Sequence, residues 1–254
     1  YEIGSGLVGS EMCIRDRSDA QIYERTCDAK TYPFSDPSPV ATPNNSYYPY
    51  FRFDGFSMQA QEKQWKMVVL ENDYVKLTVT PEIGGKIWGA IDKVNNKEFV
   101  YTNGVVKFRD VAMRGPWTSG GIEFNFGIIG HAPTCSTPID YLTKKNVDGS
   151  VSCHIFSYEW ITRTVWNVEI NLPKDKAYFT THTTWFNQSS IDQPYYQWMN
   201  AGYATKTGTR FYYPGTYSIG HSGDLHPYPI DEEGRDVSWY DNNNFGASKS
   251  LHII

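Results

Sequence analysis

The sequence lacks the features that mark nucleic-acid-binding and membrane-spanning proteins. Its 254 residues contain 23 Lys and Arg against 28 Asp and Glu, which gives a net charge of -5, and no basic run is present. A nucleic-acid-binding surface needs clustered positive charge, so this composition argues against nucleic acid as a partner. No apolar run approaches the ~20 residues that a transmembrane helix requires, so we expect no membrane span.

Cysteines and nucleotide-binding motifs are also scarce. Apart from Cys13, which lies in the N-terminal segment treated below, the chain has Cys27, Cys135 and Cys153. None of them belongs to a Cys-x-x-Cys pair, which argues against a zinc site, and we expect neither a metal nor a cofactor. Cys135 and Cys153 either remain free buried thiols or form a disulfide if their strands are neighbours. After residue 17 there is no P-loop, Gly-x-Gly-x-x-Gly or Gly-x-Ser-x-Gly motif.

The two ends of the chain do not resemble natural termini. Residues 11–17 (EMCIRDR) are encoded by GAG-ATG-TGT-ATA-AGA-GAC-AGG in one permitted back-translation. That coding contains the end sequence of a transposase-based sequencing adapter, so residues 1–17 are predicted to be a translated artefact that carries no information on the fold. The chain stops on the apolar sequence LHII (251–254). We therefore expect a fragment that is cut at both ends.

Aromatic residues are abundant, at 16% with 19 Tyr and 8 Trp, which favours β-strands and flat ligand-binding surfaces. Residues 18–64 are Pro-rich and polar and predict an extended lead-in. From residue 65 onward, short β-rich runs alternate with turn signals such as Asn95-Asn96 and Asp148-Gly149, and the last run covers residues 209–213. No long stretch shows helical periodicity. The pattern predicts an all-β antiparallel sandwich or barrel over residues 65–254, without an internal linker.

One stretch concentrates the residue types that hold a polar, hydroxylated ligand. It reads GPWTSGGIEFNF (115–126) and is followed by GHAPT (130–134). Its glycines permit a close approach of the backbone to a ligand or to another strand. Under strict strand alternation Glu123 and Asn125 share one face, about 7 Å apart, and the apolar residues between them share the other. The two polar side chains either bind sugar hydroxyls or lie on a solvated sheet face.

Five further side chains are candidates for the same site. His131 lies in a constrained loop, where an imidazole either orients a hydroxyl and transfers a proton or has a structural role only. Trp117 and Trp198 either stack on a sugar ring or fill the core. Asn200 shares a strand face with Trp198, and Arg114 would add a charged donor at the rim of the site.

Two motifs carry a resemblance to known families. TPEIGGKI (80–87) resembles an early strand–turn–strand of aldose-1-epimerase-like proteins. GGIEFNF (120–126) with the following Gly130-His131 resembles a motif of an uncharacterised bacterial domain family that is similar to galactose mutarotase and often precedes tetratricopeptide repeats. The resemblance covers residues 47–254. It implies a large antiparallel β-supersandwich, truncated at its C-terminus, with a sugar cleft on its concave sheet.

The resemblance also implies roles for particular residues. His131 falls where mutarotases carry their acid histidine, and the chain reads MNAGY (199–203) where their second histidine would stand. The first prediction is a domain that binds carbohydrate and, if catalytic, processes it. Its catalytic candidates are Glu123 and His131, and its binding candidates are Arg114, Trp117, Asn125, Trp198 and Asn200. One alternative is a glycoside hydrolase with Glu123 as one of two carboxylates. The other is a non-catalytic scaffold that precedes tetratricopeptide repeats.

Overall fold

The computed structural model describes residues 18–33, 57–110, 116–127, 132–194, 196–203, 207–220, 223–243 and 252–253. The predicted artefact at residues 1–17 lies outside the described residues. The chain divides into two compact units, Tyr1–Tyr203 and Ala204–Ile254, which are described separately below. Apart from two 3-10 helices, every described element is a strand, so the predicted all-β class is confirmed. Within the described ranges, no helix is long and apolar enough to cross a membrane.

The largest sheet of the first unit has eight strands. They are β1 (Gln21–Tyr32), β2 (Gln61–Glu71), β3 (Val75–Thr80), β4 (Lys86–Asp92), β5 (Lys97–Val100), β6 (Val106–Lys107), β9 (Ile122–Phe126) and β14 (Gln197–Ala201). Their order across the sheet is β14-β9-β4-β3-β2-β1-β6, and β5 pairs with β4. All of these pairs are antiparallel except that of β1 with β6. The sheet therefore joins strands from both ends of the first unit.

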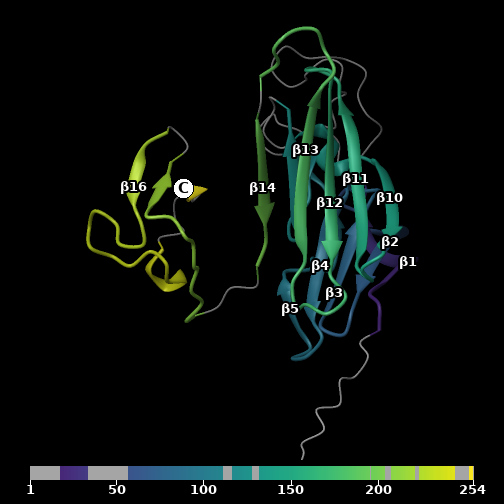
Figure 1. Ribbon diagram of the computed structural model, residues 1–254, viewed down its shortest axis with the longest axis horizontal. Coiled ribbons are helices and arrows are strands. Elements are labelled where there is room, and N and C mark those ends of the chain that lie inside the picture. Colours follow the sequence, from purple (N-terminus) through teal and green to yellow (C-terminus); the bar gives the residue numbers. More distant parts are fainter. Residues whose placement is uncertain are drawn as a thin grey trace, which may run out of the picture. The chain divides into compact units, whose positions relative to one another are not determined.

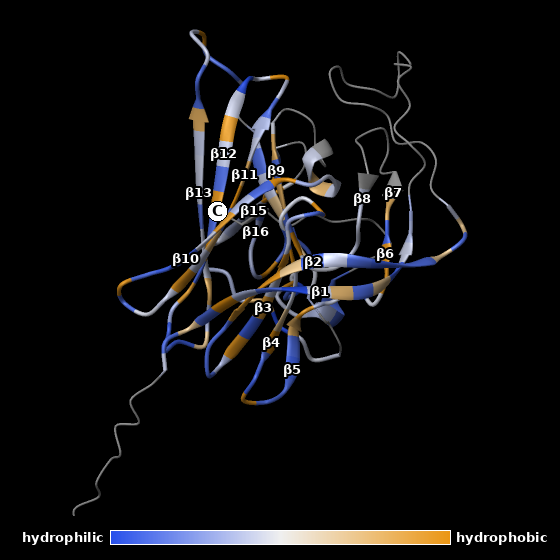
Figure 2. Ribbon diagram, turned by 90° about the vertical axis from the view of Figure 1, so that its right-hand side faces the viewer, coloured by the Kyte–Doolittle hydropathy of each residue, from blue (hydrophilic) through white to orange (hydrophobic). Residues whose placement is uncertain are grey.

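The segment that was expected to be an extended lead-in contributes β1. This strand pairs with β2 along almost its whole length, from Gln21 opposite Glu71 to Thr31 opposite Gln61. Figure 2 shows the two strands running together toward β6. Extended backbone leaves its N–H and C=O groups unpaired, and a long antiparallel partner satisfies them.

The second sheet of the first unit has four antiparallel strands. They are β10 (Asp140–Lys145), β11 (Val151–Glu159), β12 (Thr164–Leu172) and β13 (Thr180–Asn187), in that order across the sheet. The predicted turn at Asp148-Gly149 joins β10 to β11, and Gly149 supplies a φ of 81° that other residues rarely adopt. Figure 1 shows this sheet in front of strands of the larger one, which confirms the expected sandwich.

The main hydrophobic core lies between the two sheets. β9 contributes Ile122, Phe124 and Phe126, and β12 contributes alternate residues from Trp166 to Leu172. The rings of Phe126 and Trp166 stack with centroids 4.4 Å apart, so this aromatic pair joins the two sheets directly. Alternation with a period of two explains why these strands bury one row of side chains in the core.

The large sheet also buries part of its opposite face, which we call the second face. Trp65 and Met67 of β2 form a cluster there with Trp88 of β4 and with Val106 and Phe108. The residues that alternate with them on β2, Val68 and Leu70, belong to the main core instead. The second face is therefore not a solvated sheet surface, and polar groups on it need partners inside the protein.

The second unit contains a small antiparallel sheet. Its strands are β16 (Leu225–Pro227), β15 (Tyr217–Ile219) and β17 (His252–Ile253), in that order. The prediction of a strand at residues 209–213 is wrong, because only an isolated bridge between Arg210 and Trp239 forms there. Side-chain contacts hold this segment instead of a ladder of backbone hydrogen bonds. The Arg210 guanidinium lies over the rings of Tyr212 and Trp239, at 5.0 and 4.9 Å from their centroids.

The Phe126–Trp166 contact predicts a large stability cost for truncation. Phe126 is 1% exposed, so Phe126→Ala should leave a cavity between the sheets and lower the free energy of unfolding by about 3–5 kcal/mol. Phe186→Ala is the matched control, because Phe186 is 60% exposed and should cost about 1 kcal/mol or less. Urea unfolding followed by circular dichroism measures both. Equal losses in the two variants would show that Phe126 does not join the sheets.

Candidate functional site

Polar side chains from three neighbouring strands meet on the second face of the large sheet. β14 and β9 pair so that Asn200 lies opposite Glu123 and Trp198 opposite Asn125. β4 and β9 pair at Ile87 and Ile122, which places Lys86 beside Glu123 in an antiparallel ladder. The predicted alternation in β9 is confirmed, since its apolar residues face the main core. Lys86, Glu123 and Asn200 thus form one row across three strands.

Glu123 is the centre of this row. It is 2% exposed, and its Oε1 accepts hydrogen bonds from Asn125 Nδ2 at 3.0 Å and from Asn200 Nδ2 at 3.1 Å. An ionised carboxylate only accepts, so it determines which end of each amide points toward it. Hydrogen bonds to a charged acceptor are the stronger kind, and they offset part of the cost of burying the carboxylate.

Asn125 links the carboxylate to the following loop. Its Oδ1 accepts hydrogen bonds from Ala132 N at 2.9 Å and from Cys135 Sγ at 2.8 Å. Cys135 lies in the 3-10 helix η1 (Pro133–Ser136), so Asn125 fastens this helix to β9. Burial, and then the negative charge of Glu123, raises the pKa of the Cys135 thiol well above its usual value, which keeps it protonated as a donor. Cys135 and Cys153 are both buried and free, which decides between the two alternatives for this pair.

Lys86 brings a positive charge into the same buried region. It is 2% exposed, and its Nζ donates to the carbonyl oxygen of Thr118 and, at 3.1 Å, to Thr118 Oγ1. Desolvation lowers the pKa of Lys86 to about 8, although the nearby charge of Glu123 acts in the opposite direction. The ammonium group therefore releases its proton much closer to neutral pH than an exposed lysine does.

The Gly-Gly pair before β9 explains how these strands come so close. Gly121 has a φ of 66°, and a Cβ there would lie 2.3 Å from the carbonyl oxygen of Ile87. Its N–H donates to the Tyr101 carbonyl at 2.8 Å, and its own carbonyl accepts from Gly202 N at 2.8 Å. Gly121 therefore has to be a glycine, because the backbone of β4 approaches it closely beside the Lys86–Glu123–Asn200 row.

The structure brings together some of the predicted site residues and not others. Glu123, Asn125 and Asn200 are joined by hydrogen bonds, and Trp198 and Asn200 are half-buried on the edge strand β14. Trp117 is half-buried in the separate ribbon of β7 (Arg109–Asp110) and β8 (Pro116–Trp117). Arg114 and His131 lie outside the described residues.

Three members of the cluster were missed in the sequence, namely Lys86, Thr118 and Cys135. Lys86 lies within TPEIGGKI (80–87), one of the two motifs that carry the family resemblance. Its position could have indicated burial. Lys86 alternates with Trp88 at the start of a strand whose other residues up to Ile91 are apolar or glycine. Thr118 and Cys135 give no such signal, because Thr118 lies in a loop and Cys135 in a single short 3-10 helix, where no periodicity marks a face.

The buried lysine predicts a specific pH dependence of stability. Its folded-state pKa of about 8 lies below its ordinary value of 10.5, so the unfolded chain binds more protons between these two values. The free energy of unfolding of the wild type, relative to Lys86→Met, should therefore rise by on the order of 3 kcal/mol as pH increases from 8 to 10.5.

Urea unfolding at several pH values measures this difference. Lys176→Met is the matched control, because the Lys176 side chain is 51% exposed, and its curve should stay parallel to that of the wild type. A Lys86→Met curve that also stays parallel to the wild type would show that Lys86 is not desolvated.

Comparisons with known proteins agree with this architecture. Residues 42–254 match the family model described as "Domain of unknown function (DUF5107)". The fold is similar to the crystal structure of a TPR-domain containing protein from Parabacteroides distasonis, with a TM-score of 0.73 and 24% identity over 87% of this chain. The chain spans 38% of the length of that protein. The expected membership in an uncharacterised domain family is confirmed: the chain belongs to the DUF5107 family.

Proposed function

We propose that this domain binds a neutral carbohydrate at Asn200 and Trp198, on the second face of the large sheet. The observation that carries the proposal is the hydrogen bond from Asn200 Nδ2 to the buried Glu123 carboxylate. This bond orients the amide, with Nδ2 toward Glu123 and Oδ1 away from it. The Oδ1 of Asn200 accepts no hydrogen bond from any residue that the structure describes, and the side chain is partly exposed. An oriented acceptor is thus available to a ligand hydroxyl.

The indole of Trp198 supplies the apolar half of the site. Trp198 lies two residues before Asn200, so both side chains project from the same face of β14. It is half-buried, and such a ring combines a flat apolar surface with one polar edge. A sugar ring offers the complementary pair, CH groups on one face and hydroxyls around the rim. The sequence resemblance to galactose mutarotase supports the same class of ligand.

Binding is favoured over hydrolysis by the position of Glu123. At 2% exposure, with Oε1 accepting from two amides, its carboxylate supports Asn200 rather than reaching a substrate. A hydrolase would need this carboxylate at the reacting bond with a second one nearby. We therefore assign Glu123 and Asn125 the role of positioning Asn200. A catalytic role of Glu123 belongs to the hydrolase alternative only, and the catalytic role of His131 and the sugar contacts of Arg114 and Trp117 stay predictions.

A second candidate is a non-catalytic scaffold domain in a longer chain that carries tetratricopeptide repeats. The similarity to a TPR-domain containing protein favours it. The two candidates are compatible, since a scaffold domain can also hold a saccharide. The two candidates predict different results for substitutions of Trp198 and Asn200, because only the carbohydrate candidate predicts that these substitutions weaken the binding of a ligand.

The carbohydrate proposal predicts selective loss of binding in two variants. An array of neutral saccharides identifies a ligand, and calorimetry then measures its dissociation constant. Asn200→Ala and Trp198→Ala should each raise that constant about tenfold or more, because each removes a direct contact. Trp160→Ala is the control, since Trp160 is 60% exposed and lies outside β14. It should bind like the wild type.

Two results would contradict the proposal. One is that no neutral saccharide binds the wild type, which would leave the scaffold candidate. The other is that both β14 variants, shown by circular dichroism to be folded, bind as tightly as the Trp160→Ala control. Release of new reducing ends from the bound saccharide would instead support the hydrolase alternative.

A further inference from the structure

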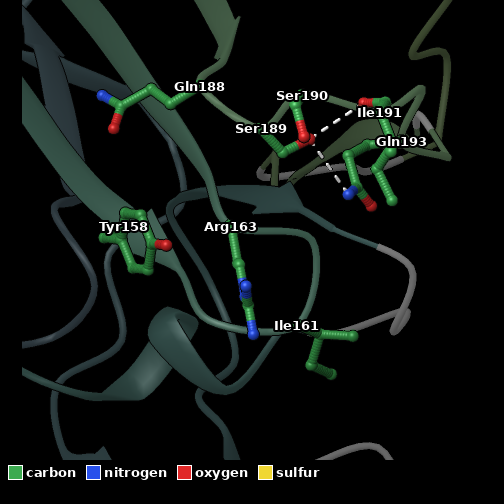
Figure 3. A pocket seen from close by; sticks show the side chains of 8 residues that line it. All are labelled: Tyr158, Ile161, Arg163, Gln188, Ser189, Ser190, Ile191 and Gln193. Carbon is green, nitrogen blue, oxygen red and sulfur yellow. Dashed lines mark hydrogen bonds between the residues drawn. The ribbon is translucent and has the colours of Figure 1, made fainter.

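A separate pocket of about 660 Å³ lies where the β11–β12 hairpin meets the segment that follows β13. The hairpin contributes Tyr158, Ile161 and Arg163. The other wall is formed by Gln188, Ser189, Ser190, Ile191 and Gln193 (Figure 3). None of the residues of the proposed carbohydrate site lines it. We propose that this pocket binds a sugar acid, that is, a hydroxylated ring that carries one carboxylate.

Arg163 is the reason to expect an anion. It is exposed, and it forms no salt bridge or side-chain hydrogen bond with any residue in the described part of the chain. Figure 3 shows its side chain extended between Tyr158 and Ile161. A guanidinium group presents a planar fork of donors that matches a carboxylate, and one such group without a second cation suits a single negative charge.

The backbone of Arg163 has an unfavourable conformation that the surrounding hairpin stabilises. Arg163 has a φ of 56°, which is uncommon for a residue with a side chain and marks strain that is often found at functional sites. The hairpin is fixed by Glu159, a carboxylate that is 4% exposed and accepts from Ile161 N at 3.1 Å and Thr162 N at 2.6 Å. Glycine or asparagine would adopt this φ with less strain, so the conformation adds to the case that Arg163 has a function.

The opposite wall is also preorganised. Asn187 Oδ1 accepts from Ser189 N at 2.9 Å and Ser189 Oγ at 2.7 Å, and Asn187 Nδ2 donates to the Ile191 carbonyl at 2.9 Å. Gln193 Nε2 donates to Ser189 Oγ at 3.1 Å (Figure 3). These bonds hold the segment in one shape before any ligand arrives, which lowers the entropy lost on binding.

The remaining polar groups of the wall suit hydroxyls. Gln188 and Ser190 have no side-chain hydrogen bond to any described residue, and Gln193 retains its carbonyl oxygen as an acceptor. All three are neutral and can both donate and accept, as sugar hydroxyls do. Ile161 and Ile191 add apolar surface for the CH groups of a ring. A carboxylate at Arg163 and hydroxyls at the opposite wall together describe a sugar acid.

Heteronuclear NMR titration of the whole chain tests this proposal. Sodium glucuronate should shift the Nε–Hε signal of Arg163 and the amide signal of Ser190 in a saturable way. Glucose lacks the carboxylate and acetate lacks the ring, so each should bind at least about tenfold more weakly. Salt at about 1 M should weaken the binding of glucuronate, because it screens an exposed charge pair. An oligogalacturonide that binds with a similar midpoint would identify a polysaccharide unit as the source, and one that fails to bind would identify the free sugar acid.

Two variants make the test specific to Arg163. Arg163→Gln removes the charge but keeps a side chain at the same strained φ, and it should weaken glucuronate binding about tenfold or more. Arg25→Gln is the matched control, because Arg25 is also exposed and lies on β1, and it should bind like the wild type. Arg163→Lys, which keeps the charge without the fork, should retain weaker, salt-sensitive binding if Arg163→Gln does not fold.

Three results would overturn the proposal: no saturable shift with glucuronate, equal midpoints for glucuronate and glucose, or unchanged binding by folded Arg163→Gln. Failure here is distinguishable from failure of the proposed carbohydrate site. A neutral saccharide at that site should shift the indole Nε1–Hε1 signal of Trp198 and leave the Arg163 signal unchanged.

Discussion

The buried carboxylate of Glu123 is the constraint on which the arrangement of the first unit depends. A carboxylate at 2% exposure is costly unless donors surround it, and the donors come from Asn125 on its own strand and from Asn200 on β14. This fixes how β9 pairs with β14. A slip of one residue in β9 would turn Glu123 toward the apolar side chains of the main core and away from both amides. The same hydrogen bonds that specify the register also orient the amide to which we assign ligand binding.

The large sheet buries side chains on both faces, and this explains the electrostatics of the site. The second face carries the apolar cluster around Trp65 and Trp88, and Lys86 projects from β4 on the same side as Trp88. Lys86 therefore loses its water, and the loss of solvation outweighs the attraction of Glu123 in setting its pKa. An ammonium and a carboxylate in one weakly hydrated region act on each other strongly, which makes their surroundings sensitive to the protonation of Lys86.

Local patterns in the sequence predicted most of the strands and the faces of β9, because period-two alternation and Asn- or Gly-containing turns are local signals. They identified β3, the turn at Gly149 and the shared face of Glu123 and Asn125. They did not reveal that Lys86 lies beside Glu123, since this depends on a pairing between strands that are far apart in the chain. They also did not show that both faces of the sheet are covered. A polar residue between apolar neighbours suggests a solvated face, and only the tertiary structure shows Asn125 at 0% exposure.

The end of β9 connects the two sites that we propose. Gly127 follows β9 with a φ of 98°, and a Cβ there would lie 2.9 Å from Cγ of Glu159. The carboxylate of Glu159 in turn holds the amides of Ile161 and Thr162, and so the hairpin that carries Arg163. The strand β9 thus orients the amide of Asn200 through Glu123. Gly127, which follows β9, contacts Glu159 at the base of the hairpin that carries Arg163. Because buried carboxylates support both sites, each site sits on a base that tolerates little movement, while its ligand-facing side chains remain partly exposed.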